Sequence, residues 1–131
     1  MQKLIVVFST LLFWAACNTA PIGNLKLNNG EKWAVNAEMK PHLEKANQVL
    51  KEYLTQNGTD YKKLAADLKA QNDQLIKSCT MKGESHDELH KWLHPHIELI
   101  SKLADASDEN LAKSIIAQLE QSFNTYQNYF Q

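Results

Sequence analysis

The sequence predicts an all-α protein: an antiparallel up-down-up-down four-helix bundle, preceded by a signal peptide and a short tether. From residue 31 onward, apolar residues recur at alternating spacings of three and four, which is the period of an amphipathic helix. Asn57-Gly58 and Lys82-Gly83 interrupt this pattern and Ser107 restarts it, so it divides into four helices joined by short turns. Short turns place consecutive helices side by side in opposite directions. The chain of 131 residues suffices for one such domain, at residues 31–131.

Residues 1–16 are predicted to be a signal peptide. A short positive start is followed by about a dozen apolar residues, which are too few to span a membrane. Small residues then precede Cys17, and the stretch resembles the signal peptide of bacterial lipoproteins, whose final cysteine is diacylated. This resemblance implies a lipid on Cys17 and, with Asn18 after it, attachment to the outer membrane facing the periplasm. Trp14 departs from the lipoprotein pattern, so cleavage after Ala16 without lipidation is the alternative.

Residues 17–30 are polar and contain proline and glycine, a composition typical of a flexible tether. Asn28 followed by Glu31 three residues later then predicts the cap of a helix that begins near Glu31 and ends at Gln56. One stripe of this helix is apolar and is predicted to be its buried face. The stripe consists of Met39, Leu43, Ala46, Leu50 and Tyr53.

The other three helices have their own start signals. Thr59 is predicted to cap the second helix, which ends before Lys82-Gly83. Ser85 and Glu88 have the spacing of a capping box and predict the start of the third helix, and Ser107 predicts the start of the fourth. The predicted buried faces are Tyr61, Leu64, Leu68, Leu75 and Cys79 in the second helix; His86, His90, Leu93, Ile97, Ile100 and Ala104 in the third; and Leu111, Ile115, Leu119, Ser122, Tyr126 and Tyr129 or Phe130 in the fourth.

Residues that bind soft metals gather where the second helix meets the third. They are Cys79, Met81, His86 and His90, with Met39 and His94 as auxiliary candidates. Histidines at positions i and i+4 lie about 6 Å apart on one helix face, so both imidazoles can bind one ion. A thiolate, a thioether and two imidazoles suit Cu(I) or Zn(II) and suit Mg²⁺ or Ca²⁺ poorly. The sequence therefore predicts a copper or zinc site at one end of the bundle.

Two alternatives stay open. In the first, His86 and His90 only form hydrogen bonds at the bundle end, Cys79 packs in the core, and His94 and His96 lie on the surface beside a proline. In the second, the protein is an interaction lipoprotein that contacts an envelope partner through an exposed apolar patch and binds no metal. A metal site requires the cysteine and the two histidines to converge, whereas these alternatives do not.

Other classes of function lack support in the sequence. The formal net charge of −1 provides no basic field for nucleic acid. His86-Asp87-Glu88-Leu89-His90 is similar to the HExxH helix of zinc peptidases, but an aspartate stands where the glutamate base belongs. A non-covalent haem between Met39 and His90 is disfavoured, and the CxxCH motif of covalent haem attachment is absent. The sequence thus predicts a binding protein and no enzyme.

Overall fold

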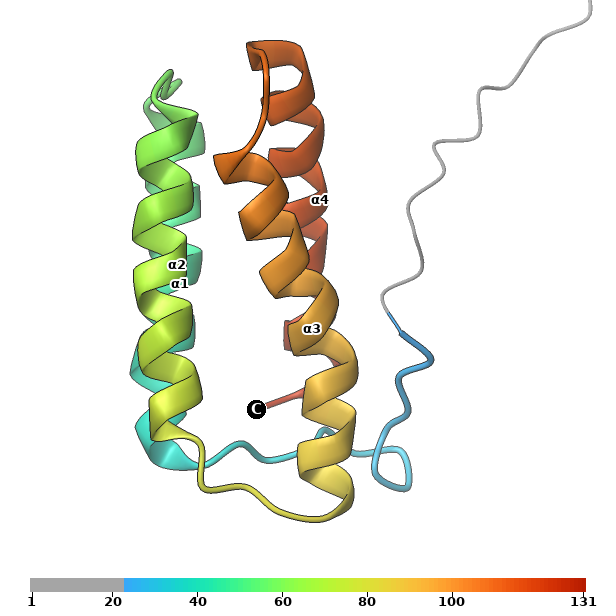
Figure 1. The fold of residues 1–131 in the computed structure, drawn as a ribbon. Coiled ribbons are helices and arrows are strands. Elements are labelled where there is room, and N and C mark those ends of the chain that lie inside the picture. Colours follow the sequence, from blue (N-terminus) through green and yellow to red (C-terminus); the bar gives the residue numbers. More distant parts are fainter. Residues whose placement is uncertain (1–22) are drawn as a thin grey trace, which may run out of the picture.

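The computed structural model describes residues 23–131; the predicted signal peptide and Cys17 lie outside the described residues. The regular secondary-structure elements assigned in the described part are all helices: a short 3₁₀ helix, η1 (Ala37–Met39), and four α-helices, α1 (Lys40–Thr55), α2 (Tyr61–Ser78), α3 (Glu84–Ala104) and α4 (Glu109–Tyr129). This confirms the predicted all-α class and agrees with a four-helix bundle. Figure 1 shows α1 beside α2 and α3 beside α4. Within residues 23–131, no helix is both long enough and apolar enough to cross a membrane.

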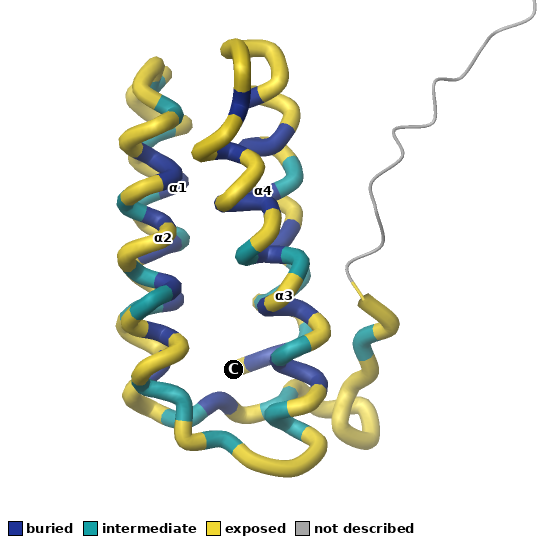
Figure 2. The backbone as a smooth tube through the Cα atoms, viewed as in Figure 1, coloured by how far each residue is buried: buried dark blue, intermediate teal, exposed yellow. Residues whose placement is uncertain are grey.

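The core consists of two apolar clusters. The large apolar cluster comprises Ala46, Leu50, Leu64, Ala65, Leu68, Leu99, Ile100, Leu103, Ala106, Ala112, Ile115, Ile116, Leu119 and Phe123. The small apolar cluster comprises Val35, Met39, Leu43, Leu75, Leu89, Trp92, Leu93 and Phe130. Figure 2 shows the buried positions along the facing sides of the helices. On α2 and α3, the buried polar residues Asn72 and His96 fall between the two clusters in sequence.

The caps of α2 and α4 lie one residue beyond their predicted positions. Asp60 Oδ1 accepts a hydrogen bond from the backbone N–H of Lys63 at 2.9 Å, and Asp108 Oδ1 accepts one from Leu111 at 2.9 Å. The predicted caps are the preceding residues, Thr59 and Ser107. The aspartates take this role because a negative charge at the start of a helix is also favoured by the helix dipole. The predicted buried residue Leu111 is 46% exposed, and Ala112 is buried in its place.

The predicted start of the first helix near Glu31 is wrong. Asn28 and Glu31 instead pair through their backbones, with N–O distances of 2.9 and 3.0 Å, around a tight turn at Asn29 and Gly30. Both turn residues have positive φ, at 51° and 89°, which asparagine and glycine tolerate best. The α-helix begins nine positions later, at Lys40, and Pro41 occupies its first turn, where the missing N–H of proline has no helical partner to lose.

Residues 23–36, which we call the N-terminal strap, run across the ends of α3 and α4. The backbone N–H of Trp33 donates to the carbonyl of Tyr129 at 2.8 Å, and the N–H of Gln131 donates to the carbonyl of Trp33 at 2.9 Å. The Trp33 indole N–H donates to the carbonyl of Lys26 at 2.6 Å. Part of the segment predicted as a tether therefore lies against the helices, because its backbone finds partners there.

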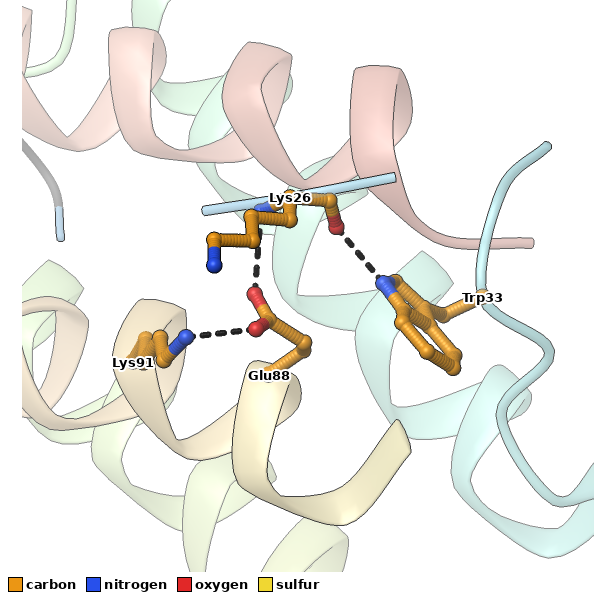
Figure 3. Close-up of polar contacts among 4 residues, drawn as sticks. All are labelled: Lys26, Trp33, Glu88 and Lys91. Atoms are coloured by element: carbon orange, nitrogen blue, oxygen red, sulfur yellow. Dashed lines mark hydrogen bonds and ion pairs between the residues drawn. The ribbon is translucent and has the colours of Figure 1, made fainter. Parts of the chain in front are cut away.

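Glu88 fixes the strap to α3 (Figure 3). Its Oε2 accepts the backbone N–H of Lys26 at 3.0 Å, and its Oε1 pairs with the ammonium group of Lys91. Burial alone would raise the pKa of Glu88, but the hydrogen bonds from Lys91 and Lys26 outweigh it and hold that pKa below its usual value. The predicted capping box does not form: Gly83 caps α3 without a side-chain bond, since Glu88 is engaged by the strap.

Candidate functional site

The buried face of α3 is rotated relative to the predicted one. Leu93 and Ile100 are buried as expected, but His86, His90 and Ile97 are only half-buried and Ala104 is exposed. The auxiliary candidate His94 is exposed as well. The helix buries the larger apolar set instead, since hydrophobic stabilisation grows with the apolar area removed from water. The buried residues of α3 are Glu88, Leu89, Trp92, Leu93, His96, Leu99, Ile100 and Leu103.

Three histidines form a ladder along one side of α3, which we call the histidine ladder: His86, His90 and His94. His86 Nε2 lies 2.9 Å from His90 Nε2, and His90 Nδ1 lies 2.9 Å from His94 Nε2. The ring centroids are 4.3 and 4.8 Å apart, and consecutive rings meet edge to face at 72° and 85°. The one-turn spacing of these residues places each ring over the next. The middle histidine thus contacts both neighbours through its two different nitrogens.

This geometry limits how protons are arranged in the ladder. A neutral imidazole has one N–H donor and one acceptor nitrogen, so His90 can donate to one neighbour and accept from the other. Burial, and secondly the proximity of His86 and His94, lowers the pKa of His90. The central ring is therefore held neutral at pH 7, the form in which imidazole binds metals.

The sulfur-containing residues lie at the same end of the fold. Cys79 caps the C-terminal end of α2 and is half-buried, and it forms no disulfide with any described residue. Cys79 and Met81 both pack against the small apolar cluster, which contains Met39 and, from α3, Leu89. Within residues 23–131, however, no three His, Cys, Asp or Glu side chains are placed so that they could hold one metal ion. The structure thus brings His86 to His90, and Cys79 and Met81 to one cluster, but it does not bring Cys79 together with both histidines as the predicted site requires.

Asn36 in the strap holds the segment that contains Cys79. Its side-chain N–H donates to the carbonyl of Ser78 at 2.9 Å, and its side-chain oxygen accepts the N–H of Thr80 at 3.1 Å. These two bonds bracket Cys79 and satisfy backbone groups that α2 leaves unpaired at its end. The side chain therefore keeps Cys79 in its extended conformation, with φ −72° and ψ 120°.

Replacing Asn36 with alanine is expected to destabilise the protein by about 2 kcal/mol, because two hydrogen bonds worth about 1 kcal/mol each are lost. The Cys79 thiol should also react faster with an aromatic disulfide reagent. Both effects can be measured in a Cys17→Ser background, in which Cys79 is the one remaining thiol. The exposed Asn124→Ala on α4 serves as the control and should change neither value. Unchanged thiol reactivity in Asn36→Ala would contradict the role assigned to Asn36.

His96 is buried in the core. The first of the two alternatives placed it on the surface and is wrong on this point, since the residue is 1% exposed. Its Nδ1 lies 2.7 Å from Ser122 Oγ, and the Trp92 indole N–H donates to the Ser122 carbonyl at 2.8 Å. The ring stacks on Trp92 at 4.7 Å, and its Nε2 is buried without a partner among the described residues. Burial lowers the pKa of His96 to about 3.

A sequence signal for this site existed. Residues 89, 92, 96, 99 and 103 recur at spacings of three and four, and His96 is the polar member of that set. Comparison with known proteins adds no further assignment, since no protein family, no curated protein and no solved structure matches this chain. Function must therefore be argued from the geometry of the sites.

Proposed function

We propose that this protein is a lipid-anchored protein of the cell envelope that binds a soft transition metal, Cu(I) first and Zn(II) second. The metal site lies at the junction of α2 and α3, in a bundle whose helices run up-down-up-down. Its ligands are Nε2 of His86 and of His90 and the sulfur of Met81. Cys79 is not placed together with both histidines, so it joins the set only if residues 79–81 move when the metal binds. The lipid on Cys17 holds the domain at the outer membrane, facing the periplasm. The protein buffers or hands over the metal and catalyses no reaction.

The observation that carries this proposal is the 2.9 Å distance between the Nε2 atoms of His86 and His90. Metal–nitrogen bonds of about 2.0–2.1 Å place two ligating nitrogens roughly 3.3 Å apart in a tetrahedral site and about 4 Å apart in a linear one. A small rotation of one ring is enough to open the pair to either distance. The two nitrogens already lie side by side, so binding requires the hydrogen bond between them to open and one ring to rotate.

The choice of a soft metal follows from the surrounding groups. A thioether, a thiol and neutral imidazoles favour Cu(I) and Zn(II), whereas Mg²⁺ and Ca²⁺ require several oxygen ligands. The nearest buried carboxylate on α3, Glu88, is bound by Lys91 and by the Lys26 N–H. Methionine ligands also allow a site with fewer than three histidine, cysteine or carboxylate ligands, as Cu(I) accepts thioether sulfur.

The test is a competition titration of Cu(I) and Zn(II) against a chelator, with the full chain carrying Cys17→Ser under reducing conditions. The expected result is one-to-one binding that His86→Ala/His90→Ala abolishes and that Met81→Leu and Cys79→Ser weaken, more for Cu(I) than for Zn(II). His42→Ala, on α1, is the matched control and should bind like the parent chain. Equal binding by the parent and the double histidine variant would overturn the proposal and favour an interaction protein that binds no metal.

His94 is expected to act on the metal site through His90. When Nε2 of His90 binds a metal, its proton resides on Nδ1, which lies 2.9 Å from Nε2 of His94 and can donate to it. A partner of this kind fixes the tautomer and the orientation of a ligating histidine. His94→Ala should therefore weaken metal binding by about tenfold, while His94→Gln, which retains an acceptor, should recover most of that loss. Affinity that His94→Ala leaves unaltered would show that the third ring is irrelevant to binding.

A further inference from the structure

An apolar groove lies between α2 and α3. Its volume is about 530 Å³, within the range of about 300–1,000 Å³ that small-molecule sites occupy. The groove forms because the alanine side chains of both helices are too short to fill the space between them. Ile76, in the wall of the groove, is 48% exposed. The apolar residues that line it are Ala65, Ala66, Ile76, Ile97, Ile100 and Ala104. None of the proposed metal ligands lines this groove, so it is a separate site.

The groove runs along α2. Its lining on α2 extends from Lys62 to Ile76. At a rise of about 1.5 Å per residue this is roughly 21 Å, about the length of an extended acyl chain of sixteen carbons. The walls that follow this length come from helix faces with few polar groups, and Asn72 and Ser101 are the uncharged polar residues among them. The length and the apolar lining thus suit an unbranched hydrocarbon chain.

The charges at the rim make the two ends of the groove different. Lys69 pairs with Asp73 at 2.8 Å, so these two charges compensate each other. The ammonium group of Lys62 instead donates to the carbonyls of Ala104 at 2.8 Å and Ala106 at 3.3 Å, at the C-terminal end of α3. No carboxylate of residues 23–131 pairs with Lys62. One positive charge that pairs with no carboxylate therefore stands at one end of an apolar groove.

We propose that this groove binds a long-chain fatty acid, with the hydrocarbon chain along α2 and α3 and the carboxylate at Lys62. The apolar walls remove the chain from water, and Lys62 supplies the charge complement for a single anionic end. Lys62 lines the groove and pairs with no acid of the described residues, so a carboxylate can join it without displacing one. The proposal is independent of metal binding.

The test is displacement of a fluorescent fatty acid by palmitic acid, with the full chain carrying Cys17→Ser so that no attached lipid competes. Shorter fatty acids should bind more weakly, by up to about fourfold for each methylene removed. The methyl ester of palmitic acid should bind about threefold more weakly than the acid, because it lacks the charge. Lys62→Gln should remove this difference between acid and ester. Ala66→Phe should fill the groove and abolish binding, whereas the matched Ala117→Phe on the exposed side of α4 should leave binding intact.

Circular dichroism melting of the two phenylalanine variants shows whether both are folded before binding is compared. Failure of palmitic acid to displace the probe overturns the proposal, and so does displacement that Ala66→Phe leaves unchanged. Sedimentation analysis supplies a further outcome. A dimer of the parent chain that Ala66→Phe converts to a monomer would mean that a second copy occupies the groove, and this too overturns the proposal.

Discussion

Lowering the pH from 7 to 4 is expected to reduce the free energy of unfolding by about 3 kcal/mol through His96 alone. An unfolded histidine takes up a proton near pH 6.5, but in the folded protein burial lowers the pKa of His96 to about 3. Between these values the unfolded state binds more protons than the folded state. The free energy of unfolding therefore has its full value above pH 6.5. Between pH 6.5 and about 3 it falls by about 1.4 kcal/mol for each pH unit.

The diagnostic window is pH 5 to 7, where carboxylates remain ionised. Below pH 5 the free energy of unfolding also falls because Glu88 and Asp108, whose pKa values are lowered in the folded protein, must take up protons. Urea unfolding at several pH values measures the effect. His96→Gln, which keeps a polar side chain beside Ser122 but cannot titrate, should flatten most of the pH dependence. A smaller dependence should persist, because the pKa of His90 is also lowered.

His42→Gln is the control for the loss of one histidine, since it leaves the buried ring in place, and it should preserve the pH dependence of the parent. The slope of the free energy of unfolding against pH is the quantity to compare, because His96→Gln also alters packing and so changes the absolute value at pH 7. A slope that is the same in the parent and in His96→Gln would show that His96 is not the group that couples folding to protons.

Trp92→Ala is expected to destabilise the protein by about 4 kcal/mol, a large share of the stability of an ordinary domain. The Trp92 side chain is completely buried in the small apolar cluster, where it stacks on His96 and contacts Tyr126 at a centroid distance of 4.9 Å. Removing it leaves a cavity that the surrounding helices cannot close. It also leaves the Ser122 carbonyl without its indole donor.

Two further variants separate these contributions in urea unfolding experiments. Trp92→Phe retains most of the ring contacts but removes the N–H, so we expect a loss of about 1–2 kcal/mol. Leu54→Ala changes a side chain that is 38% exposed and should cost less than about 1 kcal/mol. If Trp92→Ala costs no more than Leu54→Ala, the small apolar cluster does not have the role in stability given to it above.

Several elements follow from the local sequence. The turn at Asn57-Gly58 and the glycine at 83, with φ 70°, separate helices as predicted, because these residues adopt conformations that other side chains avoid. The stripes of the first, second and fourth helices place Leu43, Leu68 and Leu119 in the core, as expected. Periodicity succeeded there because each helix has one dominant apolar face.

The start of the first helix required longer-range information. A cap with an acid three residues later is a common helix signal, but the backbone of residues 28–36 pairs with itself and with Tyr129 and Gln131. Those partners belong to the far end of the chain, so no local pattern contains them. Glu88 illustrates the same limit: its spacing from Ser85 fits a capping box, but the amide of Lys26, distant in sequence, takes its carboxylate.

The local sequence is enough to predict the all-α class, the four helices, and the clustering of histidine and sulfur side chains near the junction of α2 and α3. Which face of α3 turns inward depends on packing between the helices. Two apolar stripes compete on that helix, and packing against α2 and α4 favours the one with Trp92 and Leu103 because it buries more apolar area. That choice places His96 in the core and leaves His86, His90 and His94 as a ladder at the margin. The identities of the ligand residues are therefore local information, whereas their exposure depends on the packing of the whole domain.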